Sequence, residues 1–395
     1  MHLFRKILTT GIPVFFVAFL YPLPAQNIIE LDGYLNDMQT VYFIEDDDWY
    51  WENQVHNRLN LHLYPTSWLT GSIQLRNRFI QGSTVGKFPG YSETITGDAG
   101  WADLSFTHDG TYSDHTGYIL SSMIDRAWLE FTAGNFVATI GRQRINWGQT
   151  FVWNPNDIFN TYSYFEVDYR ERPGSDALRL QYYTGMASNI ELAAKIDSAG
   201  RITAAGYYRF NAGGYDIQVL GGVLREEDLV LGTGWSGNLG NTAFRGELSY
   251  FRDLDRFKDT TGYLIASAGW DYMFKNSLWI RGEILYSSLA DELRLSGFLQ
   301  LLSSGMDVKT IGFTEWSLYT SASYPITPRL NSTLAIMYYP DWKGLFAGPS
   351  LDYNVAENFD LSLIFQLFSA EREDFTGSTS RQETGVGYVR AKWSF

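Results

Sequence analysis

The C-terminal stretch Gly385–Phe395 alternates between apolar and polar side chains, with a period of two residues. The apolar face carries Val389, Ala391, Trp393 and Phe395. The polar face carries Tyr388, Arg390, Lys392 and Ser394. The same alternation recurs along most of the chain. A sheet with one apolar and one polar face over this length can close on itself, with lipid outside and water inside. Its last strand then pairs with its first, so that no edge is left in hydrocarbon. The pattern predicts an all-β fold, a transmembrane antiparallel up-and-down β-barrel.

Composition limits the alternatives. A chain of 395 residues fits either several soluble domains or one large barrel. The aromatic share of 16% fits both strand propensity and girdles of Trp and Tyr at two membrane interfaces. The absence of Cys excludes a thiolate metal site, a disulfide framework and a catalytic thiol. The formal charge of −14 argues against a nucleic-acid partner. We expect no cofactor.

The N-terminus has the pattern of an export signal. Arg5 and Lys6 precede the mostly apolar run Ile7–Leu20, and Ala25 offers a small residue for cleavage. The alternative, a retained anchor, is disfavoured because the apolar run is short for a membrane span. We therefore predict a signal peptide over residues 1–25 and a barrel over residues 26–395. An exported chain of repeated amphipathic strands indicates the outer membrane of a Gram-negative cell.

Strand candidates come in pairs joined by short Gly-, Asn- and Pro-rich turns, whereas other connections are long. Counting from an opening strand at Leu31–Phe43 gives about 18 strands. Sixteen is the alternative, because Ser122–Glu130 and Gly232–Ser236 have weak strand patterns. The long connections are expected near residues 81–118, 146–174, 288–309 and 370–381. Short periplasmic turns and long extracellular loops are typical of outer-membrane barrels, and 16 to 18 strands enclose an aqueous channel.

The segment Gly141–Asp157 leaves a predicted strand at about Ile145 and enters a long loop that is unusually apolar. Its aromatic side chains find cover if the loop folds into the lumen and packs on the wall as a constriction. Asn154 and Asp157 then order the loop as a turn and a helix cap. The constriction-loop residues are Trp147, Trp153, Asn154 and Asp157, beside Arg142 and Arg144, which line the narrowing or pair with loop acids. In the alternative interpretation, Trp147 and Trp153 are girdle residues and Arg142 is a structural ion-pair partner.

This segment also carries a family resemblance. The matching positions are Gly141, Arg142, Gln143, Trp147, Gly148, Asn154, Pro155 and Asp157. They resemble the Gly-Arg-Gln-x-x-x-Trp-Gly … Asn-Pro-x-Asp pattern of a family of porin-like outer-membrane proteins. More loosely, they are similar to the Gly-Arg-Gln strand of alginate-export barrels. The C-terminal strand ending in Phe395 resembles the signature of bacterial outer-membrane barrels, which implies recognition by the barrel-assembly machinery.

The period-two pattern places a set of charged side chains on the lumen face. The predicted pore-lining residues are Arg58, Arg76, Arg78, Arg179, Arg209, Arg245, Arg281, Arg390, Glu247 and Glu283. Basic groups outnumber acids on this face, which favours anionic or polar solutes near the wall. The alternative is a wall neutralised by ion pairs, as the spacing Arg245-x-Glu247 and Arg281-x-Glu283 suggests.

The sequence therefore predicts a passive channel for small hydrophilic solutes, with anionic preference as an open option. Its other expected partners are outer-membrane lipid and lipopolysaccharide. A barrel that exports polysaccharide or takes part in envelope assembly is the alternative. A surface hydrolase built around His115 is a third hypothesis, but the loop composition does not require catalysis, and we expect no enzyme activity. The solute and the oligomeric state stay open.

Overall fold

A computed structural model describes most of the chain. The described residues are 28–44, 49–88, 90–113, 116–169, 171–172, 174–259, 261–289, 307–373 and 379–395. The predicted signal peptide and His115 lie outside these residues.

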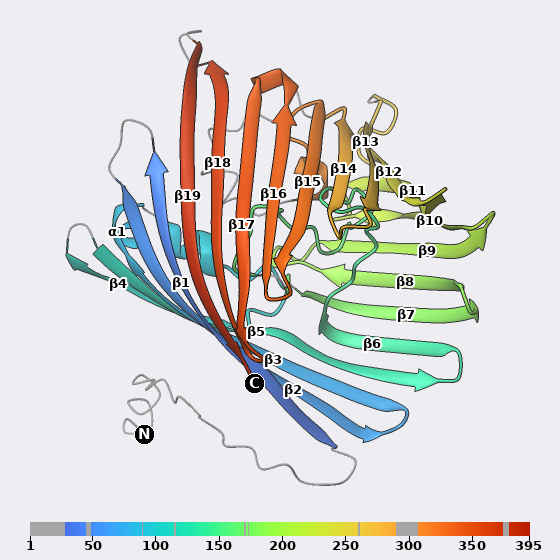
Figure 1. Ribbon diagram of the computed structural model, residues 1–395. Helices are drawn as coiled ribbons and strands as arrows, with labels where there is room; N and C mark the ends of the chain where they lie inside the picture. Colours follow the sequence, from blue (N-terminus) through green and yellow to red (C-terminus); the bar gives the residue numbers. More distant parts are fainter. Residues whose placement is uncertain are drawn as a thin grey trace, which may run out of the picture.

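Nineteen β-strands make one antiparallel sheet (Figure 1). The first ten are β1 (Ile29–Ile44), β2 (Tyr50–Thr66), β3 (Leu69–Gly82), β4 (Ser105–Ser113), β5 (Thr116–Ala133), β6 (Phe136–Gln143), β7 (Ser175–Gly185), β8 (Ser188–Ile196), β9 (Ile202–Ala212) and β10 (Tyr215–Leu224). The others are β11 (Asp228–Leu239), β12 (Thr242–Asp253), β13 (Tyr263–Met273), β14 (Trp279–Ser287), β15 (Trp316–Thr327), β16 (Leu330–Tyr339), β17 (Gly344–Ala356), β18 (Phe359–Glu373) and β19 (Thr379–Ser394).

The sheet closes into a barrel because its last strand pairs with its first. Strand β19 runs beside β1, with Tyr34 opposite Ser394. Beyond β19, Phe395 and Gly33 exchange two backbone hydrogen bonds of 3.0 Å each. Eighteen strands form the closed ring, and β4 pairs along the upper part of β5. The prediction of about 18 strands is confirmed, and both weak strand candidates lie inside strands, β5 and β11.

The two faces of the wall differ as the alternation predicts. Large apolar side chains are exposed on the outer face, among them Ile140, Leu178, Leu192, Leu231, Leu334 and Leu363. Polar and charged side chains alternate with them and point inward. The wall therefore has an apolar outside, and its inside combines polar side chains with buried apolar ones such as Val230, Phe251, Ile265 and Leu285.

The connections differ between the two ends of the barrel. At one end they are tight turns such as 134–135 and 186–187. At the other end lie the long connections 83–115, 144–174 and 288–315. The predicted connection 370–381 is shorter in the structure, because β18 and β19 continue as a paired hairpin through Glu373 and Thr379.

The connection 83–115 was predicted as a loop but contains regular structure. It holds helix α1 (Ser83–Lys87), helix α2 (Tyr91–Thr96) and strand β4. Two 3-10 turns, η2 (Val308–Thr310) and η3 (Pro340–Trp342), lie in other connections. Among the described residues, no helix has the length and apolar character needed to cross a membrane.

Candidate functional site: the loop inside the barrel

The connection between β6 and β7, residues 144–174, folds into the lumen and is called the inner loop. Strand β6 has only eight residues, so the chain leaves the wall early. The loop has two parts, which we call the first lobe (residues 145–160) and the second lobe (residues 161–172). The first lobe contacts strands from β8 to β15, and the second lobe contacts strands from β15 through β19 to β5.

Two glutamates of the wall hold the backbone of the first lobe. The Glu283 carboxylate accepts hydrogen bonds from the backbone N–H groups of Phe151 (2.8 Å), Val152 (3.1 Å) and Trp153 (2.8 Å). The Glu247 carboxylate accepts hydrogen bonds from the N–H groups of the residues at 149, 150 and 156. Successive N–H groups that converge on a carboxylate form an anion nest, in which each hydrogen bond is charge-assisted. The two glutamates therefore fix the path of the lobe.

Apolar packing reinforces these contacts. Trp147 packs edge-on against Phe159 and Tyr207, with ring centroids 4.8 and 4.9 Å away, and its indole N–H donates to Glu191 at 2.7 Å. Trp153 packs in the same manner against Tyr319. These side chains belong to one buried apolar cluster inside the barrel, which also includes Val308, Ile311, Phe313, Met337, Tyr339 and Phe346. The lumen on the side of β8–β17 is thus filled by a hydrophobic core.

The second lobe places a carboxylate against the opposite wall. Asp168 accepts hydrogen bonds from Asn36 Nδ2 at 2.8 Å and from Gln54, and it pairs with His56 Nδ1 at 2.9 Å. Burial alone would raise the pKa of Asp168, but the His56 contact and the nearby Arg78 hold it below its ordinary value. Asp168 is therefore a charged group that fixes the lobe to β1 and β2.

Further contacts hold the lobe along its length. Arg126 donates to the backbone carbonyls of Glu171 (2.7 Å) and Arg172 (2.8 Å). Tyr34 donates to the Glu171 carboxylate at 3.1 Å. Arg390 donates to the Val167 carbonyl at 3.2 Å. Residues 167–172 are therefore held by single side-chain contacts, whereas Tyr164 and Phe165 of the second lobe pack in the same apolar cluster as the first lobe.

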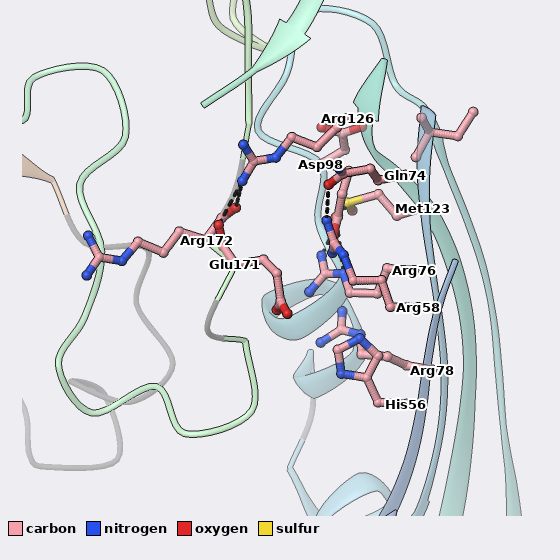
Figure 2. Close-up of polar contacts among 12 residues, drawn as sticks. His56, Arg58, Gln74, Arg76, Arg78, Asp98, Met123, Arg126, Glu171 and Arg172 are labelled. Carbon is pink, nitrogen blue, oxygen red and sulfur yellow. Dashed lines mark hydrogen bonds and ion pairs between the residues drawn. The ribbon is translucent and has the colours of Figure 1, made fainter. Parts of the chain in front are cut away.

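Beneath the second lobe, basic side chains of β2, β3 and β5 lie one above another. Figure 2 shows this arginine column, which consists of His56, Arg58, Arg76, Arg78 and Arg126. Asp125 joins two of its members, at 2.5 Å from Arg58 and 3.1 Å from Arg76. Arg76 also lies over the ring of Tyr169 in the lobe, 3.9 Å from its centroid. Three of the four predicted arginines of this region thus lie together: Arg58, Arg76 and Arg78, whereas Arg390 contacts the lobe from β19.

The other predicted lumen arginines are spread around the ring. Arg179 forms a two-pronged ion pair with Glu191, with both distances 2.7 Å. Arg245 pairs with Asp271 at 2.7 Å, and Arg281 lies 3.2 Å from Ser321 Oγ. Arg209 is exposed.

The suggested pairs Arg245 with Glu247 and Arg281 with Glu283 are not the hydrogen-bonded pairs of the structure. Both glutamates turn to the backbone of the inner loop instead. The two arginines lie over the Phe151 ring, at 4.1 Å for Arg245 and 5.7 Å for Arg281. A carboxylate that collects several N–H groups of one loop is satisfied without a cation partner.

Arg142 lies in a different place from the predicted constriction. It shares the outer face of β6 with Ile140, and it pairs with Asp176 (2.7 Å) on β7 and Asp98 (2.7 Å) in the connection before β4. Arg142 Nη2 also donates to the Ala102 carbonyl at 2.5 Å. These contacts agree with the alternative interpretation of the sequence, in which Arg142 is a structural ion-pair partner and does not line a constriction. The reason is that β6 and β7 are short, and residues 98–104 cross above them to meet Asp197 at the end of β8.

Asn154 and Asp157 lie in the buried centre of the first lobe. The Asn154 side chain fills the space beside Gly148, where an added Cβ would lie 2.3 Å from its oxygen. Asp157 is 1% exposed, and burial raises its pKa to about 6 despite the nearby Arg144, Arg172 and Lys195. Neither residue reaches a water-filled surface in this arrangement.

Three carboxylates of the site were missed from the sequence, namely Asp98, Asp125 and Asp168. Asp125 lies at a bulge of β5, where the register shifts, so the period-two reading breaks at that residue. Asp98 and Asp168 lie in long connections, where no periodicity marks a partner. Within the described residues, no group of three or more metal-ligating side chains is placed to hold a metal ion.

Comparisons with known proteins reveal the fold. No family model matches the chain, and no curated protein matches it by sequence. Solved structures do match over nearly the whole chain. Acinetobacter baumannii OccAB1 has 10% sequence identity and a TM-score of 0.59, covering 93% of this chain and 97% of that one. Acinetobacter baumannii OccAB4 has 11% identity and a TM-score of 0.57 (94% and 99% covered), and Pseudomonas aeruginosa OccK11 (OpdR) has 11% and 0.56 (93% and 96%).

Proposed function

We propose that this protein is an outer-membrane porin, a passive channel through which small hydrophilic solutes diffuse, with a preference for anions. The closed ring of 18 strands supports the proposal, because rings of this size enclose a lumen wide enough for water. The apolar outer face is the surface that such a barrel presents to lipid. The solved barrels of the same fold include outer-membrane porins of Pseudomonas and Acinetobacter.

The observation that carries the anionic preference is the arginine column. The column gathers four arginines on β2, β3 and β5, whereas the other lumen arginines are spread around the ring. Asp125 forms ion pairs with two arginines of the column, Arg58 and Arg76, while Asp168 pairs with His56. Arg78 and Arg126 donate to backbone carbonyls, those of Ile95 and of Glu171 and Arg172, and we expect their charge to attract anions toward this wall. The Asp168 carboxylate of the second lobe pairs with His56 of this column at 2.9 Å, which supports the proposal that anions are attracted to this wall.

The proposal is tested by conductance in a planar bilayer. Purified protein should give discrete current steps, and a KCl gradient should give a reversal potential of the sign expected for an anion-selective channel. Arg126→Gln should shift that reversal potential toward zero. Arg201→Gln is the matched control, since Arg201 pairs with Asp197 and Glu227 in connections at the barrel end and loses the same charge away from the column. A silent membrane, or cation selectivity unaffected by Arg126→Gln, would contradict the proposal.

Catalysis is not part of this proposal. The hydrolase hypothesis depends on His115, which lies outside the described residues. The other loop histidine, His108, lies 3.2 Å from the Tyr118 hydroxyl on the exposed hairpin of β4 and β5. The polysaccharide-export hypothesis would be favoured instead if conductance required a periplasmic partner protein.

Processing and assembly complete the proposal. Residues 1–25 act as an export signal that is removed, and the C-terminal strand is read by the barrel-assembly machinery. The pairing of Phe395 with Gly33 supports the second point, because the terminal residue takes part in closing the ring. Deleting Phe395 should lower the yield of folded barrel in the membrane, as measured by heat-dependent mobility on gels, while the level of exported chain is unchanged.

A further inference from the structure

A hollow lies on the outer face of the wall, below the segment 98–104 that crosses above β6 and β7. We call residues 98–104 the covering segment. Its Gly100 forms an isolated β-bridge with Asp197 at the end of β8, and the Leu104 carbonyl accepts from Ile124 N–H of β5 at 3.1 Å. The hollow between the covering segment and the short strands has a volume of about 560 Å³, within the usual range of ligand pockets.

The residues around the hollow belong to five neighbouring strands, β5 to β9, and to the covering segment. Ile140 of β6 and Leu178 of β7 are 54% and 45% exposed, and both alternate with inward residues of their strands. The apolar side chains of the lining are Trp101, Leu104, Ile140, Leu178, Ile196 and Ile202. The hollow is therefore continuous with the apolar band of the barrel exterior.

The charged groups that line the hollow have partners: Lys195 donates to the Phe159 carbonyl on the lumen side, and Arg142 pairs with Asp176. Arg142 lies at its upper margin and is 4% exposed, with its guanidinium shared between Asp98 and Asp176. A guest in the hollow thus meets hydrocarbon side chains and a satisfied ion pair, which suits a chain without polar atoms. The covering segment belongs to the end of the barrel that carries the long connections, which is the extracellular end of an outer-membrane barrel.

We propose that this hollow binds an acyl chain of a lipopolysaccharide molecule in the outer leaflet. The inference rests on the proposed membrane location and goes beyond it by assigning a lipid to one place on the wall. The occupant follows from three observations together: an apolar lining, continuity with the surface that faces lipid, and a position at the extracellular rim. The acyl chain fills the space under the covering segment and keeps water from the Arg142 ion pairs.

Native mass spectrometry of the full barrel, purified in detergent and mixed with hexa-acylated lipopolysaccharide, tests this inference. Wild-type protein should retain one lipopolysaccharide molecule more tightly than any others. Leu178→Trp, which fills the hollow, should weaken that binding at least tenfold. Ile140→Trp should act in the same direction and provides a second variant if the first does not fold. Leu334→Trp is the matched control, because Leu334 is an outward leucine of β16 with similar exposure, 43%, away from the hollow.

The outcomes separate the two proposals. Equal retention by Leu178→Trp, Ile140→Trp and Leu334→Trp proteins would overturn the acyl-chain site. Tighter retention of phosphatidylethanolamine than of lipopolysaccharide, or a stable oligomer that disappears with Leu178→Trp, would also overturn it, because another occupant then covers the hollow. Each protein is also recorded in a planar bilayer. If the wild type gives normal current steps and the hollow-filling variants retain lipopolysaccharide as the wild type does, only this inference is rejected. If the wild type is silent in the bilayer but retains lipopolysaccharide selectively, only the proposed channel is rejected.

Discussion

At the residue scale, the carboxylates of the lumen are distinguished by what they face. Glu283 accepts hydrogen bonds from three backbone N–H groups, and Asp168 accepts from two amides beside a histidine, so each has its hydrogen-bond partners. Asp157 is buried among apolar side chains of the first lobe, with cationic groups at its margin. The same functional group therefore holds a lobe in place in two positions and carries a cost of burial in the third.

The pH dependence of the first lobe should follow Asp157. Its pKa is raised to about 6, against about 3.9 for an unperturbed aspartate. Protonation therefore stabilises the folded lobe by up to about 3 kcal/mol, fully below pH ~4, and this contribution is lost as the pH rises through 6. The charged groups that face Asp157 are Arg144, Arg172 and Lys195. Single-channel current fluctuations should be rarer at pH 5 than at pH 7.5.

Asp157→Asn is the variant that isolates this effect. The amide does not titrate, so the variant should lose the part of the pH dependence that Asp157 contributes, and fluctuations should differ less between pH 5 and pH 7.5 than in the wild type. A variant that keeps the wild-type pH dependence would assign the titration to another group, and the explanation through Asp157 would fail.

A second residue-scale prediction concerns Asp168. Asp168→Asn removes the negative charge that pairs with His56 and accepts hydrogen bonds from Gln54 and Asn36. The second lobe should then detach from the arginine column more often. We expect larger mean conductance and stronger anion selectivity, measured from current steps and reversal potential. The control is Asp216→Asn, which removes the same charge from an exposed lumen position on β10. It should leave the mean conductance of the channel unchanged. Lower conductance in Asp168→Asn would show that the lobe is not the barrier.

At the element scale, local periodicity determined what could be predicted. The strands, their number and their inward faces follow from alternation, which is a property of each strand alone. The route of the inner loop depends on partners far away in sequence, such as Glu283 with Trp153. The aromatic content of residues 147–159 correctly indicated a loop that needs cover. It did not indicate that Arg142 faces outward, because that depends on where β6 ends.

The first lobe should loosen when a carboxylate nest is removed. Glu283→Ala leaves the N–H groups of residues 151–153 without their acceptor, at a cost of roughly 2–4 kcal/mol to the folded lobe. Hydrogen exchange at these amides should become faster by roughly 30-fold or more. Asp360→Ala is the control, since Asp360 accepts from Asn354 at the turn end of the barrel. Unchanged exchange in Glu283→Ala would mean that apolar packing alone fixes the lobe.

At the scale of the whole molecule, the barrel is closed in two different ways. Between β1 and β19 the backbone ladder runs along both strands. Above the short β6 and β7 the wall is completed by residues 98–104, which reach from β5 to the end of β8. The second closure has few ladder hydrogen bonds and depends on side chains. Arg142 is the residue that joins its parts, through Asp98, Asp176 and the carbonyls of Ala102 and Ile124.

Arg142 should therefore matter more to stability than any exposed arginine. Arg142→Ala leaves two carboxylates buried without their cation, and breaking a buried pair in this way costs about 3–5 kcal/mol. Arg142→Lys should recover only part of this loss, because an ammonium group cannot make the two-pronged contact with Asp176. Arg256→Ala, which breaks an exposed pair with Asp253, should have little effect on stability, because water already screens the two charges. Urea unfolding in lipid vesicles, followed by tryptophan fluorescence, measures all three. Equal stability of the Arg142→Ala and Arg256→Ala proteins would mean that the wall closes above β6 and β7 without this ion-pair cluster.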